Sequence, residues 1–169
     1  WKWLQKNHTQ SESVWLVYYK PSLKLGDLDA KIVVDYCLCF GWIDSVVGKV
    51  DDTKTKIRIS PRNPKSKWSR VNKENVERLM KHKMMQPAGL EMVNIAKKTG
   101  TWDALNDVEN LVLPKDLQDA LVKQNMNAAW ESLSRSYKRG YLETLLNAKK
   151  EETRKRTIAK IIHTLSTKD

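Results

Sequence analysis

Apolar residues in the first third of the chain follow the two-residue period that is typical of strands. Residues 13–19 place strand-forming side chains on both faces, which predicts a strand covered on two sides. Residues 42–50 and 56–60 predict two further strands, joined by a turn at 51–53. We therefore expect a small three-stranded sheet, antiparallel or mixed.

The helix expected between the first two strands has a start signal and a stop signal. Asp27 or Asp29 can accept a hydrogen bond from the first helical turn, and apolar positions then recur at three- and four-residue spacing up to Phe40. Gly41 follows, where a left-handed residue can end a helix. The opening residues 1–8 are typical of the last turns of another helix.

Serine, proline and glycine residues bound the helices expected in the rest of the chain. Ser69 or Asn72 can cap a helix that runs to about residue 83, and a helix that opens at Pro87 stops at Gly100. A connecting stretch covers residues 101–113. After Pro114 the spacing is helical throughout, and the expected helices cover residues 116–123, 127–133, 137–149 and 151–165.

These patterns predict an α+β protein of two domains. Residues 1–112 form the sheet, its packed helices and a basic loop, and residues 113–169 form an all-helical C-terminal module. A chain of 169 residues can bury a substantial core. No apolar run approaches the roughly 18 residues of a membrane span, and no signal peptide is visible, so we expect no membrane insertion and a cytoplasmic location.

Positive charge is concentrated in one part of the chain. The formal net charge is +11, and residues 53–83 hold eleven Lys and Arg residues against two Glu residues. Such a patch attracts phosphates, nucleic acid or anionic lipid headgroups, although a solvated, solubilising surface is the alternative. A second basic cluster lies at 149–160, where Glu151 and Glu152 precede basic residues at i,i+4 spacing. Ion pairs that stabilise the helix explain this cluster. Nucleic-acid binding by these helices is the alternative.

The two cysteines, Cys37 and Cys39, lie two positions apart in an expected helix. Side chains at this spacing point about 200° apart, so a mutual disulfide or a shared metal is disfavoured. We expect buried free thiols in a reducing compartment, no metal site and no cofactor. The histidines are expected on helix surfaces, and no hydrolase, nucleotide-loop or metal-ligand motif occurs.

Asp44 is a carboxylate within an apolar strand, where its charge requires a partner. Arg58 on the next strand and Arg62 or Arg70 beyond it are candidate partners. One interpretation is a structural ion pair that ties the hairpin to the following loop. The other makes Asp44 and these arginines the polar end of a ligand pocket.

Tryptophans near the basic residues suggest the walls of such a pocket. Trp42 lies in the strand with Asp44, and Trp68 lies in a polar loop between Lys67 and Ser69. An indole ring beside arginines can stack on a planar base, a sugar ring or a cationic group, although a role in the core is the alternative. The candidate binding residues are Trp42, Asp44, Arg58, Arg62, Lys67, Trp68, Ser69 and Arg70.

Four long motifs carry a resemblance to a known family. They are LCFGWIDS at 38–45, RISPRNPKSKWSRVNKENVERL at 58–79, LPKDLQDAL at 113–121 and AKKEETRKRTIAKII at 148–162. With them the chain resembles the bacterial YdeI/OmpD-associated family, also called the bacteriocin-protection family. The resemblance implies tolerance of bacteriocins or antimicrobial peptides and association with an outer-membrane porin, hence with the cell envelope, without a settled enzymatic activity.

Three hypotheses follow for the function. The first is a non-enzymatic protection-type protein that binds an anionic or planar ligand, or a protein partner, at the basic loop with its tryptophan. The second is a nucleic-acid-binding protein that uses the basic surface. The third is an enzyme with Asp44 in its active site.

Overall fold

The computed structural model describes residues 1–26 and 28–167. The chain divides into two units, Trp1–Ala104 and Leu105–Asp169. This division falls earlier than the expected boundary at 112/113, because Leu105 and Val108 belong to the apolar core of the second unit. A short helix there, α5 (Asn106–Glu109), is absent from the sequence-based expectation, which had an irregular connection over this stretch.

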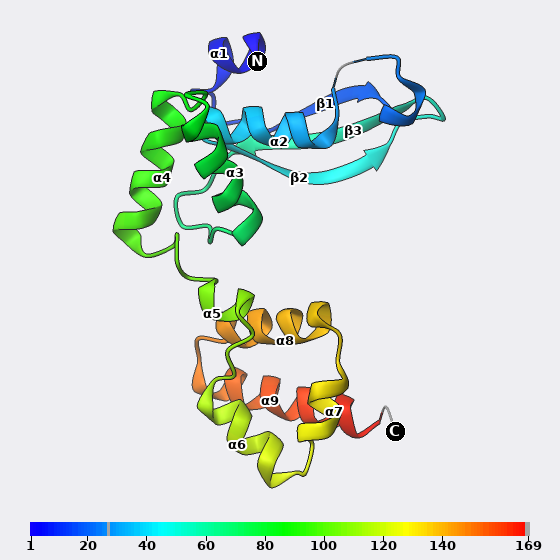
Figure 1. Cartoon of the computed structure of the whole chain (residues 1–169), viewed down its shortest axis with the longest axis vertical. Helices are drawn as coiled ribbons and strands as arrows, with labels where there is room; N and C mark the ends of the chain where they lie inside the picture. Colours follow the sequence, from blue (N-terminus) through cyan, green and yellow to red (C-terminus); the bar gives the residue numbers. More distant parts are fainter. Residues whose placement is uncertain (27, 168–169) are drawn as a thin grey trace. The chain divides into compact units, whose positions relative to one another are not determined.

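The first unit combines a sheet with helices, and α2 runs along the strands (Figure 1). The sheet has the order β1-β3-β2 with both neighbours antiparallel, which confirms the predicted α+β class and three-stranded sheet. Its elements are α1 (Lys2–Asn7), β1 (Val14–Tyr19), the 3-10 turn η1 (Pro21–Leu23), α2 (Ala30–Cys39), β2 (Trp42–Lys49), β3 (Lys54–Pro61), α3 (Arg70–Lys81) and α4 (Pro87–Thr99).

The ends of α2 follow the expected capping. The Asp29 carboxylate accepts a hydrogen bond of 2.7 Å from the backbone N–H of Ile32, so Asp29 is the N-cap. The other candidate, Asp27, lies outside the described residues. Gly41 adopts a φ of 74°, a left-handed conformation that reverses the chain into β2. On α2, Asp35 forms an ion pair of 2.6 Å with Arg78, which ties this helix to α3.

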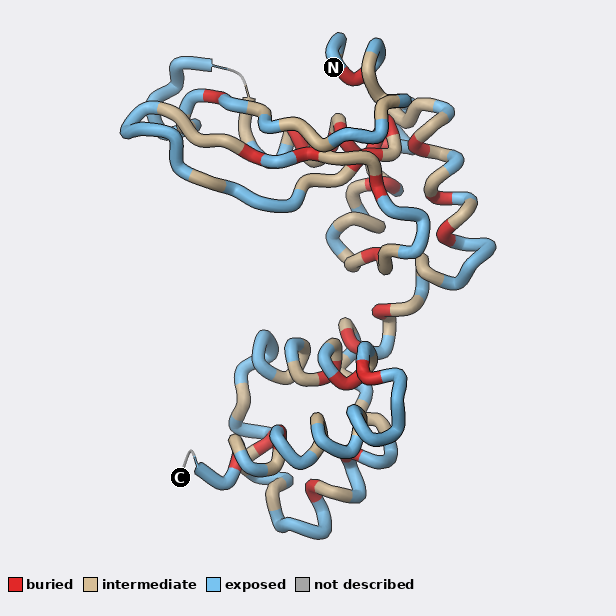
Figure 2. Tube along the Cα trace, turned by 180° about the vertical axis from the view of Figure 1, so that it is seen from behind, coloured by how far each residue is buried: buried red, intermediate tan, exposed pale blue. Residues whose placement is uncertain are grey.

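The sheet buries one face and exposes the other. Residues at alternate positions of β1 face the core, whereas Trp15, Val17 and Tyr19 are 47%, 49% and 42% exposed. The prediction of a strand covered on both sides is therefore wrong for β1. Buried or half-buried residues alternate with exposed ones along β1 and within β3, whereas β2 carries three consecutive exposed residues at 45–47 (Figure 2). Both faces of β1 carry strand formers, so the sequence pattern could not reveal that one face is open.

The second unit is entirely helical among its described residues. It contains α5, α6 (Lys115–Lys123), α7 (Asn127–Ser132), α8 (Arg135–Asn147) and α9 (Glu151–Ser166). Its core is built from Leu105, Val108, Leu117, Leu121, Trp130, Leu142, Leu145, Ile161 and Leu165. Ser134 caps α8 by accepting a hydrogen bond from the N–H of Tyr137. Arg154 of α9 pairs with Asp116 of α6 and also donates to the carbonyl of Leu145.

Candidate functional site

Arg62 and Trp68 lie in contact immediately after the sheet. The Arg62 guanidinium carbon lies 3.6 Å from the centre of the Trp68 ring, and its Nη2 donates a 2.8 Å hydrogen bond to the carbonyl of Lys67. Both side chains are buried, with exposed fractions of 5% for Arg62 and 2% for Trp68. The segment that follows β3 thus holds a cation over an indole ring.

Two donors of the Arg62 guanidinium have no partner. Nε and Nη1 are buried and form no hydrogen bond to any described residue. Burial lowers the pKa of Arg62 to about 10, while the charge of Asp44 opposes that shift, so the side chain stays protonated at neutral pH. A buried cation with two unsatisfied N–H groups is costly, and such groups in native proteins require a partner such as water or a ligand.

An open groove of about 490 Å³ runs beside Arg62. Gly41 and Pro61 line it next to Arg62, and His8 and Glu91 contribute from α1's end and from α4. These two residues come from distant parts of the sequence and carry no pattern of their own, so sequence reasoning missed them. Among the described residues, the lining of this groove does not include Trp42, Asp44 or Trp68.

Trp68 lies in the core, although its loop is polar in sequence. Its backbone N–H donates to the carbonyl of Thr101, and its ring lies 5.0 Å from that of Trp102. Trp102, which is distant in the sequence, therefore covers the indole of Trp68. Of the two interpretations of Trp68, its burial therefore favours the core role, in which the ring packs against Arg62 and Trp102.

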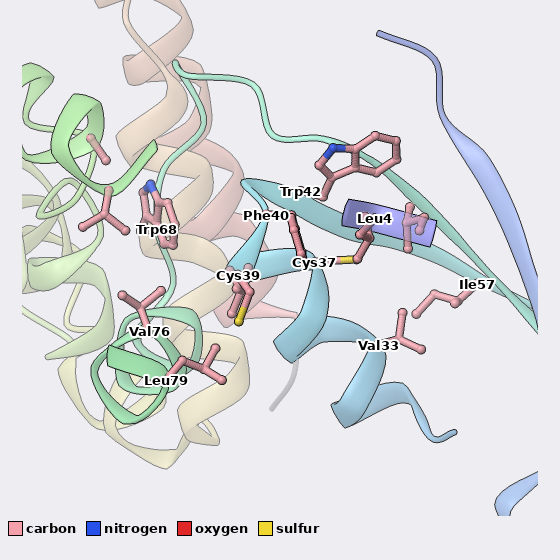
Figure 3. Close-up of a cluster of buried hydrophobic side chains, with 14 of the residues drawn as sticks. Leu4, Val33, Cys37, Cys39, Phe40, Trp42, Ile57, Trp68, Val76 and Leu79 are labelled. Carbon is pink, nitrogen blue, oxygen red and sulfur yellow. The ribbon is translucent and has the colours of Figure 1, made fainter. Parts of the chain in front are cut away.

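Trp42 is also a core residue, at 1% exposure. Its indole N–H donates a 2.8 Å hydrogen bond to the carbonyl of His8, and its ring meets Trp3 edge to face. Figure 3 shows Trp42 at β2, apart from Trp68, although both belong to one apolar cluster. The two indoles thus do not form the two walls of one pocket.

Asp44 and Arg58 do not pair with each other. Arg58 donates from Nε and Nη2 to the hydroxyl of Ser13 at 3.0 and 2.8 Å. Asp44 lies opposite Ile59 in the ladder, is partly buried, and acts on Arg62 through its charge without an ion pair to any described residue. A bulge between Asp44 and Val47 changes the register of β2 there.

The remaining predicted residues lie at the start of α3. Ser69 is the N-cap and accepts from the N–H of Asn72 at 3.3 Å, which confirms the predicted cap. Lys67 supplies the carbonyl that holds Arg62, and Arg70 is the first residue of the helix. The structure therefore gathers Arg62, Lys67 and Trp68 into one cluster. Ser69 and Arg70 follow it directly along the chain.

A separate apolar cavity of about 240 Å³ lies between α1, β1 and α2. Trp1, Trp3, Trp15 and Tyr36 contribute to its lining. Cys37 lines it as well, and burial raises the pKa of this thiol to about 12. In the part of the chain that the structure describes, no group of three or more His, Cys, Asp or Glu residues is placed to hold a metal ion.

Comparison with known families separates the two halves of the chain. The fold is an α+β unit followed by a helical unit. Residues 1–92 match the family described as a domain of unknown function (DUF8412). Because this match spans more than half of the chain, the chain belongs to that family. Residues 110–168 match the family described as bacteriocin-protection, YdeI or OmpD-associated. Neither a curated protein nor a solved structure matches.

The second match confirms the resemblance seen in LPKDLQDAL and AKKEETRKRTIAKII, which both lie within 110–168. The other two motifs, at 38–45 and 58–79, lie in the part that matches the first family. Within the described residues, every helix is too short or too polar to cross a bilayer.

Proposed function

We propose that the chain is a non-enzymatic protection-type protein that binds an anionic group of a ligand at Arg62. The observation that carries this proposal is the pair of buried Arg62 donors, Nε and Nη1, that lack a partner among the described residues. A guanidinium suits phosphate or carboxylate oxygens because its N–H groups form a planar fork.

The binding step involves a small movement of the Arg62 side chain. The two donors are covered, while the groove of about 490 Å³ lies along the same side chain. A ligand anion in the groove would draw the guanidinium away from the Trp68 ring, which it now covers at 3.6 Å. The fluorescence of Trp68 should therefore report binding. Glu91 in the lining opposes an anion and sets an upper limit on its charge.

The two units contribute different support. The description as bacteriocin protection attaches to residues 110–168, whereas Arg62 lies in the part that matches the domain of unknown function. We assign ligand binding to the first unit and the link with protection to the second. Two buried free thiols, Cys37 and Cys39, support a reducing compartment, and we place the protein in the cytoplasm.

Titration with inorganic phosphate tests the proposal. Calorimetry measures the heat of binding, and intrinsic tryptophan fluorescence measures the movement of Arg62 from Trp68. Arg62→Lys should weaken phosphate binding about 10- to 100-fold, since charge-assisted hydrogen bonds contribute about 1.5–3 kcal/mol. Glu91→Gln should strengthen binding, because a negative charge leaves the groove. Trp68→Phe should remove the fluorescence change while the heat of binding persists.

Arg156→Lys is the matched control, because Arg156 is exposed and paired with Glu152. It should leave phosphate affinity unchanged. Thermal melting of each variant shows whether the fold is kept. Equal affinity of the Arg62 and Arg156 variants, or no heat of binding in the parent protein, would overturn the proposal.

A further inference from the structure

The open face of the sheet combines aromatic rings with positive charges in a regular pattern. Cross-strand partners share a face, and the register pairs Trp15 with Arg58, Val17 with Lys56 and Tyr19 with Lys54. The three side chains from β1 are exposed, as is Arg58. Rings and cations thus alternate across neighbouring strands on one surface, which we call the open face.

The cations on this face lie against the rings. The Lys56 ammonium lies 4.7 Å from the centre of the Trp15 ring, and the Lys54 ammonium lies 5.5 Å from that of Tyr19. Ser13 holds the Arg58 guanidinium through two hydrogen bonds. Trp15 and Tyr19 therefore each have a positive charge close to the ring, as in surfaces that combine base stacking with phosphate contacts.

No acidic side chain offsets these charges within β1 or β3. Neither strand contains Asp or Glu. Asp44 of β2 is paired with Ile59, which is buried, and so lies on the opposite face of the ladder. The open face is consequently cationic and partly aromatic, and its charge complements a polyanion.

We propose that the open face binds single-stranded nucleic acid. Bases stack on Trp15 and Tyr19, and Lys54, Lys56 and Arg58 contact the phosphates. Trp15 and Tyr19 lie four residues apart along β1, which corresponds to about 13 Å. The two stacked bases are therefore separated by the position of Val17. Stacking requires unpaired bases, which favours a single strand over a duplex.

Fluorescence anisotropy with a labelled oligothymidylate of about 12 nucleotides at low salt tests this site. Trp15→Ala and Tyr19→Ala should each weaken binding at least about fivefold, because each removes a stacking ring. Lys56→Ala combined with Arg58→Ala should weaken binding further. Affinity should fall with salt at a logarithmic slope of about −2, as expected for three phosphate contacts to a single strand.

Matched controls lie elsewhere on the surface. Tyr137 is an exposed aromatic residue of α8. Replacing both Lys155 and Arg156 of α9 removes the same charge as replacing both Lys56 and Arg58 of the open face. Tyr137→Ala, and Lys155→Ala combined with Arg156→Ala, should leave oligothymidylate affinity within about twofold.

Several outcomes would overturn the proposal. One is no binding of the oligonucleotide at low salt. Another is an equal loss of affinity in the α9 variant and in the variant of the open face, which would indicate diffuse charge. A third is an affinity for a duplex that equals the affinity for the single strand and is unchanged by Trp15→Ala. A fourth is binding to phosphatidylserine vesicles without binding to the oligonucleotide.

Discussion

Gly89 of α4 packs directly against the backbone carbonyl of Cys39 at the end of α2. A Cβ at Gly89 would lie 2.6 Å from the carbonyl oxygen of Leu38 and still closer to that of Cys39. The N–H of Gln86 donates to the same Cys39 oxygen at 3.0 Å, which fixes the start of α4 at this point. The two helices can approach this closely only because residue 89 has no side chain.

Gly89→Ala should therefore destabilise the first unit. Alanine favours a helix by about 1 kcal/mol over glycine, but the clash with backbone atoms should outweigh that gain and cost about 1–3 kcal/mol. Urea unfolding measures the change. Gly140→Ala in α8 is the matched control, because a Cβ there would meet nothing within 4 Å, and it should stabilise the second unit by up to about 1 kcal/mol. Equal effects of the two substitutions would contradict this explanation.

The buried thiols make stability depend on alkaline pH. Burial raises the pKa of Cys37 to about 12 and of Cys39 to about 11, from 9.0. Above pH 9 the unfolded chain loses these protons while the folded chain keeps them, so stability is full below pH 9 and falls as pH rises toward 11. The loss between pH 8 and pH 10 should be about 1 kcal/mol for each thiol.

Urea unfolding at the two pH values measures this loss, and Cys37→Ala and Cys39→Ala should each reduce it. In the folded protein, both thiols should react slowly with a soluble disulfide reagent at pH 8 and react fully after unfolding. Rapid reaction of either thiol under native conditions would contradict the burial on which the prediction rests.

The Arg154–Asp116 pair makes the second unit sensitive to acid. The hydrogen bond from Arg154 lowers the pKa of Asp116 from 3.8, so this contribution is present above pH 4 and is lost as pH falls through the lower pKa of the folded state. Arg154→Ala should cost up to about 1 kcal/mol at pH 7, since both side chains are partly exposed, and less at pH 2.

Urea unfolding at both pH values tests this dependence. The exposed pair of Arg156 with Glu152 is the control, and Arg156→Ala should change stability by less than about 0.5 kcal/mol. If the cost of Arg154→Ala were the same at pH 7 and pH 2, the hydrogen bond to the Leu145 carbonyl would account for it instead.

The helices could be predicted because their signals are local. Asp29, Ser69 and Ser134 each cap a helix through a hydrogen bond to a residue three positions later, so neighbouring residues are sufficient to find the helix start. The strand positions followed from alternation in the same way. Local patterns thus predicted most element positions, with α5 and the 3-10 turn η1 as exceptions.

Burial within the candidate site could not be predicted, because it depends on distant residues. Trp68 has polar neighbours in sequence, yet Arg62 and Trp102 cover its ring. Arg58 bonds to Ser13, 45 positions away, rather than to Asp44 on the adjacent strand. Which side chain meets which is decided by the packing of whole elements, and a single sequence does not encode that in a readable pattern.

The two apolar clusters of the chain have no residue in common, since one ends with Trp102 and the other begins with Leu105. The two family matches lie on either side of this junction, with one ending at residue 92 and the other starting at 110. A recombination event at this junction would transfer either cluster intact. Each half can thus have its own ancestry and diverge at its own rate.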